Sequence, residues 1–437
     1  MVALSRFTLL LFLCVALASM GLPQGNAALD SLLERSKAEP ANFLLFEQIG
    51  VEYARLSEFG KAAEFFRKSV ALNPERIPSK KNLATVLWFS GKRDESAAIF
   101  SSLETVIPDD PVPQLYLGLN DYDRKNMEMA AKHFVRAGTL ASDNPETFSI
   151  VVETYILTGR SGQAIQLLER RIASGASDSQ TYRWLGDAYD SQSQPEKAYR
   201  AYSDAIDRQP KAEENYLALA AFSIEHANPA FARDVLARGL RQIPGSAKLL
   251  LEFGLAWALQ GDFEKARQYF ADASTAQPSW SLPLLALGVT DLQTGDAKQA
   301  AECFRKAKVT APDDYRCYYL HAVALNRSQS DQNSTGRALA TSELRHAISL
   351  NPHHAKARVA LAEAEIADGR TSAAEAELRE ALRIEPTESS ALYKLALLCR
   401  REGKTQEAER LLHAFQQSKD KSHSEENEFV LILKTVE

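Results

Sequence analysis

The chain has 437 residues, of which 51 are Lys or Arg and 57 are Asp or Glu, giving a formal net charge of −6. This mildly acidic balance disfavours nucleic acid as the main partner, and a hydrophobic fraction of 45% is typical of a folded protein. A chain of this length ordinarily forms two or three domains, unless it is built from repeats.

Residues 1–27 have the pattern of a secretory signal. One basic residue, Arg6, precedes an apolar run over residues 7–22, and small residues lead to a cleavage position after Ala27. Removal of this segment leaves 50 basic and 57 acidic residues, a net charge of −7. We therefore expect a secreted or periplasmic protein with no membrane span after cleavage. The alternative is an uncleaved membrane anchor through residues 7–22.

Prolines mark an internal repeat in the rest of the chain. Positions 142 and 176 continue the series with Ser and Ala, so the register persists there without the proline. A period of 34 residues is typical of stacked helical pairs. The prolines that follow this spacing are Pro40, Pro74 and Pro108, then Pro210, Pro244, Pro278 and Pro312, and finally Pro352 and Pro386.

Each repeat contains two helical patterns. The stretch YRWLGDAY, residues 182–189, spaces bulky and small residues as one face of a helix does, and Ala198 followed by Tyr202 begins a second such face. With the closing proline, this pattern resembles the tetratricopeptide repeat family, whose signature is W-x2-L-G-x2-Y, A-x3-F and a final P. The resemblance implies an all-α fold, an α-solenoid in which helix-turn-helix pairs wind into a right-handed superhelix.

The register divides the mature chain almost completely. We expect a signal peptide at 1–27, a half repeat at 28–42 that caps the array, eleven repeats over 43–422, and a tail at 423–437. The expected repeat starts are residues 43, 77, 111, 145, 179, 213, 247, 281, 315, 355 and 389.

One repeat carries six additional residues, because Pro312 and Pro352 are 40 residues apart. The surplus falls in NRSQSDQNSTGRA, which we expect to lie between the two helices of the repeat at 315. Asn326 and Asn333 begin N-glycosylation sequons there. The segment is either an exposed loop that carries glycan or a surface insertion in which the sequons are fortuitous.

Neither catalytic nor metal-binding patterns accompany the repeats. The sequence has no G-x-S-x-G, P-loop, G-x-G-x-x-G or H-E-x-x-H motif, so we expect no enzyme activity, no cofactor and no metal. Packing or surface roles account for His353 and His354. The mature chain keeps Cys303, Cys317 and Cys399, which allow at most one disulfide among them.

In the family, positions two, five, nine and twelve of each first helix line a concave groove. These positions are mixed in the early repeats and largely apolar from residue 217 onwards. The resemblance thus implies a protein-interaction scaffold that binds a protein or peptide in an apolar groove. The alternatives are plain packing between repeats, and a carrier or chaperone that shelters a hydrophobic ligand. The expected groove residues are Leu217, Leu251, Leu255, Leu285, Val289, Leu292, Tyr319, Val323, Val359 and Tyr393.

The tail contains an apolar run, FVLIL at residues 429–433, after a polar stretch. Such a run is prone to aggregate if it stays in water. It therefore either caps the last helix pair, folds into the apolar groove of its own chain, or docks on another chain.

Overall fold

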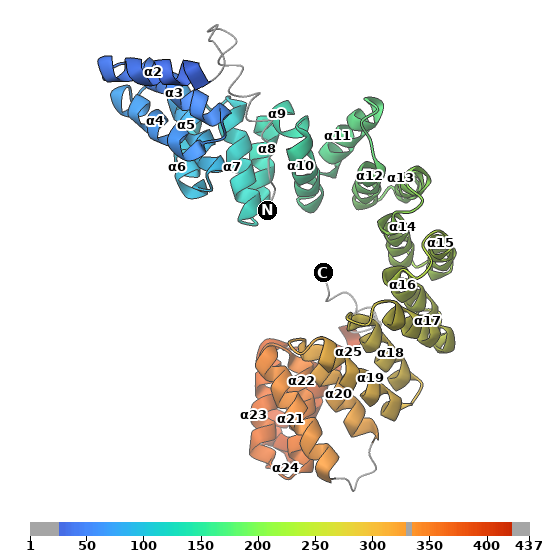
Figure 1. The fold of residues 1–437 in the computed structure, drawn as a ribbon. Helices are drawn as coiled ribbons and strands as arrows, with labels where there is room; N and C mark the ends of the chain where they lie inside the picture. The colour runs from blue at the N-terminus through green and yellow to red at the C-terminus, as the bar shows by residue number, and fades with distance from the viewer. Residues whose placement is uncertain (1–25, 329–333, 422–437) are drawn as a thin grey trace. The chain divides into compact units, whose positions relative to one another are not determined.

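The computed structural model describes residues 26–328 and 334–421, and every regular element in these ranges is a helix (Figure 1). The chain divides into two units, one up to Ala205 and the other from Ile206. The expected signal peptide lies outside the described residues apart from Asn26 and Ala27, which begin the first helix. The apolar run at 429–433 also lies outside them.

Unit 1 contains a single helix, α2, followed by successive helix pairs; α13 crosses the boundary between the units. Its elements are α2 (Asn26–Ala38), α3 (Phe43–Arg55), α4 (Phe59–Leu72), α5 (Ile77–Phe89), α6 (Arg93–Val106), α7 (Pro111–Asp123), α8 (Met127–Ala137), α9 (Thr139–Ser142), α10 (Pro145–Leu157), α11 (Ser161–Ala173), α12 (Ser179–Ser191) and α13 (Pro195–Arg208).

Unit 2 continues with helix pairs of similar length. First helices across the described chain begin at the residues counted in the sequence register, except that α18 begins one residue later, at Leu282. The elements are α14 (Glu213–Glu225), α15 (Pro229–Gln242), α16 (Ala247–Ala258), α17 (Phe263–Ala276), α18 (Leu282–Gln293), α19 (Ala297–Thr310), α20 (Tyr315–Ser328), α21 (Ser334–Leu350), α22 (Ala355–Ala367), α23 (Thr371–Ile384), α24 (Ser389–Arg401) and α25 (Thr405–Lys421).

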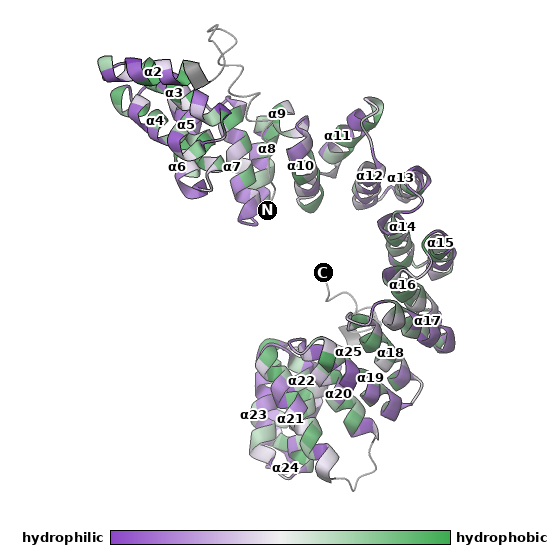
Figure 2. Ribbon diagram, viewed as in Figure 1, coloured by the Kyte–Doolittle hydropathy of each residue, from purple (hydrophilic) through white to green (hydrophobic). Residues whose placement is uncertain are grey.

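Helices of each unit pack on their sequence neighbours. The substantial contacts among described residues join elements that are at most two places apart along the chain. Hydrophobic and hydrophilic residues share most helices (Figure 2), as expected when one face packs against a neighbour and the other meets solvent. The fold is an all-α solenoid, because cores form between consecutive helices instead of around one centre.

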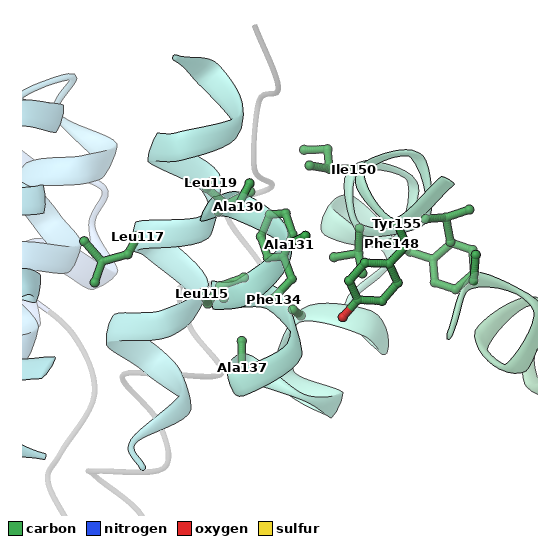
Figure 3. Close-up of a cluster of buried hydrophobic side chains, with 14 of the residues drawn as sticks. Leu115, Leu117, Leu119, Ala130, Ala131, Phe134, Ala137, Phe148, Ile150 and Tyr155 are labelled. Atoms are coloured by element: carbon green, nitrogen blue, oxygen red, sulfur yellow. The ribbon is translucent and has the colours of Figure 1, made fainter. Parts of the chain in front are cut away.

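Small residues at the eighth position of the first helices let the paired helix approach. A Cβ atom on Gly118 would lie 2.6 Å from the ring of Phe134, and one on Gly254 would lie 2.6 Å from the ring of Phe270. Phe134 of α8 is 1% exposed and belongs to a core that α7 and α10 share with it, where Leu115 and Phe148 lie (Figure 3). The glycine of the family pattern is thus a packing requirement in this chain.

Glycine stops the second helix in the two repeats that lack the closing proline. Helix α8 ends at Ala137, followed by Gly138 at φ +59°, and the short α9 follows. Helix α11 ends at Ala173, and Gly175 has φ +75°. Because glycine adopts the left-handed conformation readily, it ends a helix as effectively as proline does.

The insertion is partly helical, which corrects the expectation of a loop beginning at Asn326. Helix α20 continues through Ser328 with Asn326 exposed on it, because no glycine or proline interrupts the residues before that point. Helix α21 has 17 residues, against the 14 of α19 or α23. Asn333 lies outside the described residues.

Candidate functional site

The structure buries half of the residues that the sequence assigns to the groove. Their side chains fill the packing between helices and leave little surface for a partner. The buried residues are Leu251 (2% exposed), Leu255 (7%), Leu285 (0%), Val289 (3%) and Val359 (5%). At these positions the packing alternative describes the side chains better than a groove does.

The burial has a simple cause. Positions five and nine of a first helix face both the putative groove side and the first helix of the following repeat, as the contacts between α14 and α16 and between α18 and α20 indicate. A side chain of the right size is therefore covered by the neighbouring repeat. The remaining five residues keep solvent-accessible surface: Leu217, Leu292, Tyr319 and Val323 are half-buried, and Tyr393 is 43% exposed.

Three of these residues form what we call the α18–α20 face, defined as Leu292, Tyr319 and Val323. Tyr319 and Val323 are four residues apart on α20 and so lie on one side of that helix. Leu292 of α18 and Tyr319 pack against the same buried core in unit 2. The face therefore joins two consecutive first helices with side chains that are fixed at their base and open at their tips.

Histidine extends this face toward α22. The ring of His354 lies 4.8 Å from that of Tyr319 and 4.9 Å from that of Tyr315, measured between ring centroids. Its Nδ1 accepts a hydrogen bond from the backbone N–H of Ala357 at 3.2 Å and so caps α22. Burial, assisted by the charge of Lys356, lowers the pKa of His354 to about 4. The imidazole is thus neutral at physiological pH, and the cluster is aromatic without a charge of its own.

The corresponding side chains of unit 1 are polar and engaged with neighbouring repeats. Glu47 accepts a hydrogen bond from the Arg76 guanidinium at 3.0 Å, and the Lys81 ammonium donates to Asp110 at 2.6 Å. Tyr122 donates its hydroxyl hydrogen to Glu153 at 2.8 Å. Each contact joins one repeat to the next, so these groups serve the array before they serve a partner.

A surface pocket of about 510 Å³ lies beside α2 in unit 1. The Lys68 ammonium lies 4.6 Å from the centre of the Phe65 ring in its wall. Its lining is Asp30, Leu33, Glu34, Ser36, Lys37, Phe46, Phe65 and Lys68. Two acidic and two basic groups balance there, so the pocket has no strong preference for a charged ligand.

Cysteine and histidine side chains build no reactive centre in the described part of the chain. Cys303, Cys317 and Cys399 are buried free thiols, and burial raises the pKa of Cys303 and of Cys317 to about 12. Thiols of this kind are poor nucleophiles at neutral pH. Among residues 26–328 and 334–421, no group of His, Cys, Asp and Glu is placed to hold a metal ion. Within the same ranges, none of the helices combines the length and apolarity needed to cross a membrane.

Sequence reasoning missed Tyr315 and His354 as parts of the cluster. His354 precedes the first helix of its repeat, where a side-chain acceptor is favoured, and this position was the available signal. The contact with two tyrosines of α20 depends on the packing of α20 beside the start of α22, which no local pattern reports.

Comparison with known proteins identifies the repeat. Residues 337–398 match the family model described as tetratricopeptide repeat. Together with the helix pairs of both units, this confirms the family predicted from the 34-residue register: the chain is a tetratricopeptide repeat protein. Proteins of this family are generally non-catalytic scaffolds, so the fold supports a role in protein–protein interaction.

Several solved structures are similar in fold. They include MamA 41-end from Desulfovibrio magneticus RS-1, at 19% identity over 40% of this chain and 96% of that one, with a TM-score of 0.36. Yeast Tom70 is 14% identical over 99% of this chain and 98% of that one, with a TM-score of 0.42. The Cut9–Hcn1 hetero-tetramer of the APC/C is 13% identical over 82% and 76%, with a TM-score of 0.43. TM-scores this low carry no argument about function. No curated relative matches the sequence.

Proposed function

We propose that this protein is an exported, non-catalytic scaffold that binds a segment of a partner protein on the α18–α20 face. The observation that carries the proposal is the group of half-exposed Leu292, Tyr319 and Val323 beside a neutral His354. Rigid apolar and aromatic side chains with buried bases contribute strongly to protein interfaces, because ordering them on binding costs little entropy.

The chemistry of the face favours a partner segment with apolar side chains. An amphipathic helix or an extended peptide would place such residues against Tyr319 and Val323, with its polar side chains toward solvent. Export is proposed from the pattern of residues 1–27 alone.

The proposal is tested by purifying the full chain from its own host. We compare the unaltered chain with the double variant Tyr319→Ser/Val323→Ser and with Val309→Ser, an apolar residue that is 76% exposed on α19. Co-purified partner should fall by at least about tenfold in the double variant, because removal of one interface hot spot usually costs more than 1 kcal/mol. Val309→Ser should retain the partner.

Mass spectrometry of the same samples decides the alternatives. The intact mass of an exported chain should begin after Ala27, and a mass that includes residues 1–27 contradicts cleavage. Equal recovery of the same polypeptide from all three proteins contradicts binding at the α18–α20 face. A bound mass of lipid size in place of a polypeptide identifies a carrier instead.

A further inference from the structure

The last described helix pair exposes positions that inner repeats bury. At the fifth position of the first helix, Leu251 is 2% exposed, Leu285 is 0% exposed and Val359 is 5% exposed, whereas the equivalent Tyr393 of α24 is 43% exposed. Leu397, four residues later on the same side of α24, is 37% exposed. The difference arises because α24 lacks a following first helix in the described structure.

The second helix of this pair shows the same difference. In α23, Leu378 and Ala381 are fully buried at 0% exposure. Their equivalents 34 residues later in α25 are Leu412 and Phe415, which are only half-buried. The ring of Phe415 lies 5.3 Å from that of Tyr393. We define Tyr393, Leu397, Leu412 and Phe415 as the α24–α25 face, a continuous apolar surface on one helix pair.

Unit 1 shows how this chain treats the other end of the array. Helix α2 precedes the first complete pair and places Leu29 and Leu32 in one cluster with residues of α3. Leu45 and Ile49 of α3 are 1% and 0% exposed as a result. A segment outside the repeats thus covers the first pair, so an uncovered last pair is the exception within this molecule.

The sequence immediately after α25 supplies a matching segment. Residues 429–433 are five consecutive apolar residues, and only the polar stretch 422–428 separates them from the end of α25 at Lys421. Seven residues span up to about 25 Å. Phe415 lies six residues before Lys421, about 9 Å along the helix axis. The polar stretch is therefore long enough for residues 429–433 to return to the α24–α25 face.

We propose that residues 429–433 pack on the α24–α25 face of the same molecule and cover it as α2 covers the first pair. Large contiguous apolar surfaces are seldom left in water, and an uncovered β-prone run is an aggregation hazard. Both hazards disappear when the two surfaces meet. This inference is independent of the α18–α20 face and of its partner.

Disulfide trapping tests the contact in the full chain. The double variant Leu397→Cys/Ile432→Cys should form an intrachain disulfide under mild oxidation, seen as a monomer by non-reducing electrophoresis and intact mass. The control pair, Val309→Cys/Ile432→Cys, places the first thiol on exposed α19, away from the α24–α25 face. The native cysteines are buried. A disulfide between two chains identifies a second copy as the occupant and overturns the proposal, as does equal trapping in both variants.

Hydrogen exchange gives a second readout without new cysteines. Leu431→Asp should remove the segment from the face and speed amide exchange in α25 by about tenfold, because local opening then requires less free energy. The control Ser424→Asp adds the same charge in the polar stretch and should leave exchange unchanged. Identical exchange in the two variants contradicts the proposal.

Discussion

One backbone position recurs through the array in a conformation that most residues avoid. The residue between the two helices of a repeat has a positive φ, and in six repeats it is glycine, as in Gly261 at φ +79°. In four other repeats a residue with a side chain occupies the same place: Ser57, Lys125, Ser193 and Ala227, with φ between 55° and 60°. The turn geometry therefore prevails over residue preference, at a cost to those four repeats.

Exchanging residues at this position tests that cost. Ala227→Gly should stabilise the protein by about 0.5–1 kcal/mol, because glycine relieves the strain of the left-handed conformation but is more flexible in the unfolded chain. Gly261→Ala, at the same position one repeat later, should destabilise by a similar amount. Urea unfolding measures both. Effects of the same sign for the two variants would show that contacts, and not φ, decide the choice.

At the scale of elements, the sequence predicts the helices far better than the contacts of their faces. Prolines and the small-residue pattern specify where each pair begins, because helix stops and close packing depend on local chemistry. The pattern does not distinguish Leu285, which the next first helix covers, from Tyr393, which no described helix covers. Both are apolar residues at the fifth position, and only the presence of a neighbour separates core from surface.

The same limit applies to charged residues. Asp291 of α18 looks like an ordinary surface residue in the sequence, yet it is 1% exposed. Its carboxylate accepts a hydrogen bond from Arg267 Nε of α17 at 2.7 Å, and the Cys303 thiol of α19 lies 3.6 Å away. Burial raises the pKa of Asp291 even though Arg267 opposes the shift. Three consecutive helices thus depend on one ion pair.

Arg267→Met should destabilise unit 2 by about 2 kcal/mol at neutral pH, because it leaves a buried carboxylate without its cationic partner; the partial exposure of Arg267 moderates the loss. The folded state binds a proton at Asp291 more tightly than the unfolded chain does. The deficit should therefore shrink as pH falls through the folded pKa. Adding Asp291→Asn should recover part of the stability, and unfolding across pH measures all three proteins. A deficit that does not change with pH would assign the loss to packing of the Arg267 stem.

At the scale of the whole molecule, the contact pattern is nearly one-dimensional. Substantial contacts among described residues join helices at most two places apart, so each pair is stabilised by itself and its immediate neighbours. The stability of such an array is a sum of local terms, and damage should remain local. This behaviour differs from that of a domain with one common core, where a core substitution weakens every element together.

Two equivalent core substitutions, one in each unit, test this locality. Phe134 in α8 and Phe304 in α19 are 1% and 0% exposed, and they pack against Gly118 and Gly288 at the same position of their repeats. Phe134→Ala and Phe304→Ala should each remove about 3–5 kcal/mol from the local stability. Hydrogen exchange should accelerate in α6 to α10 for the first variant and in α17 to α20 for the second, with the other unit unchanged. Acceleration throughout the chain in either variant would show that the two units unfold as one cooperative body, and that long-range coupling outweighs the nearest-neighbour contacts.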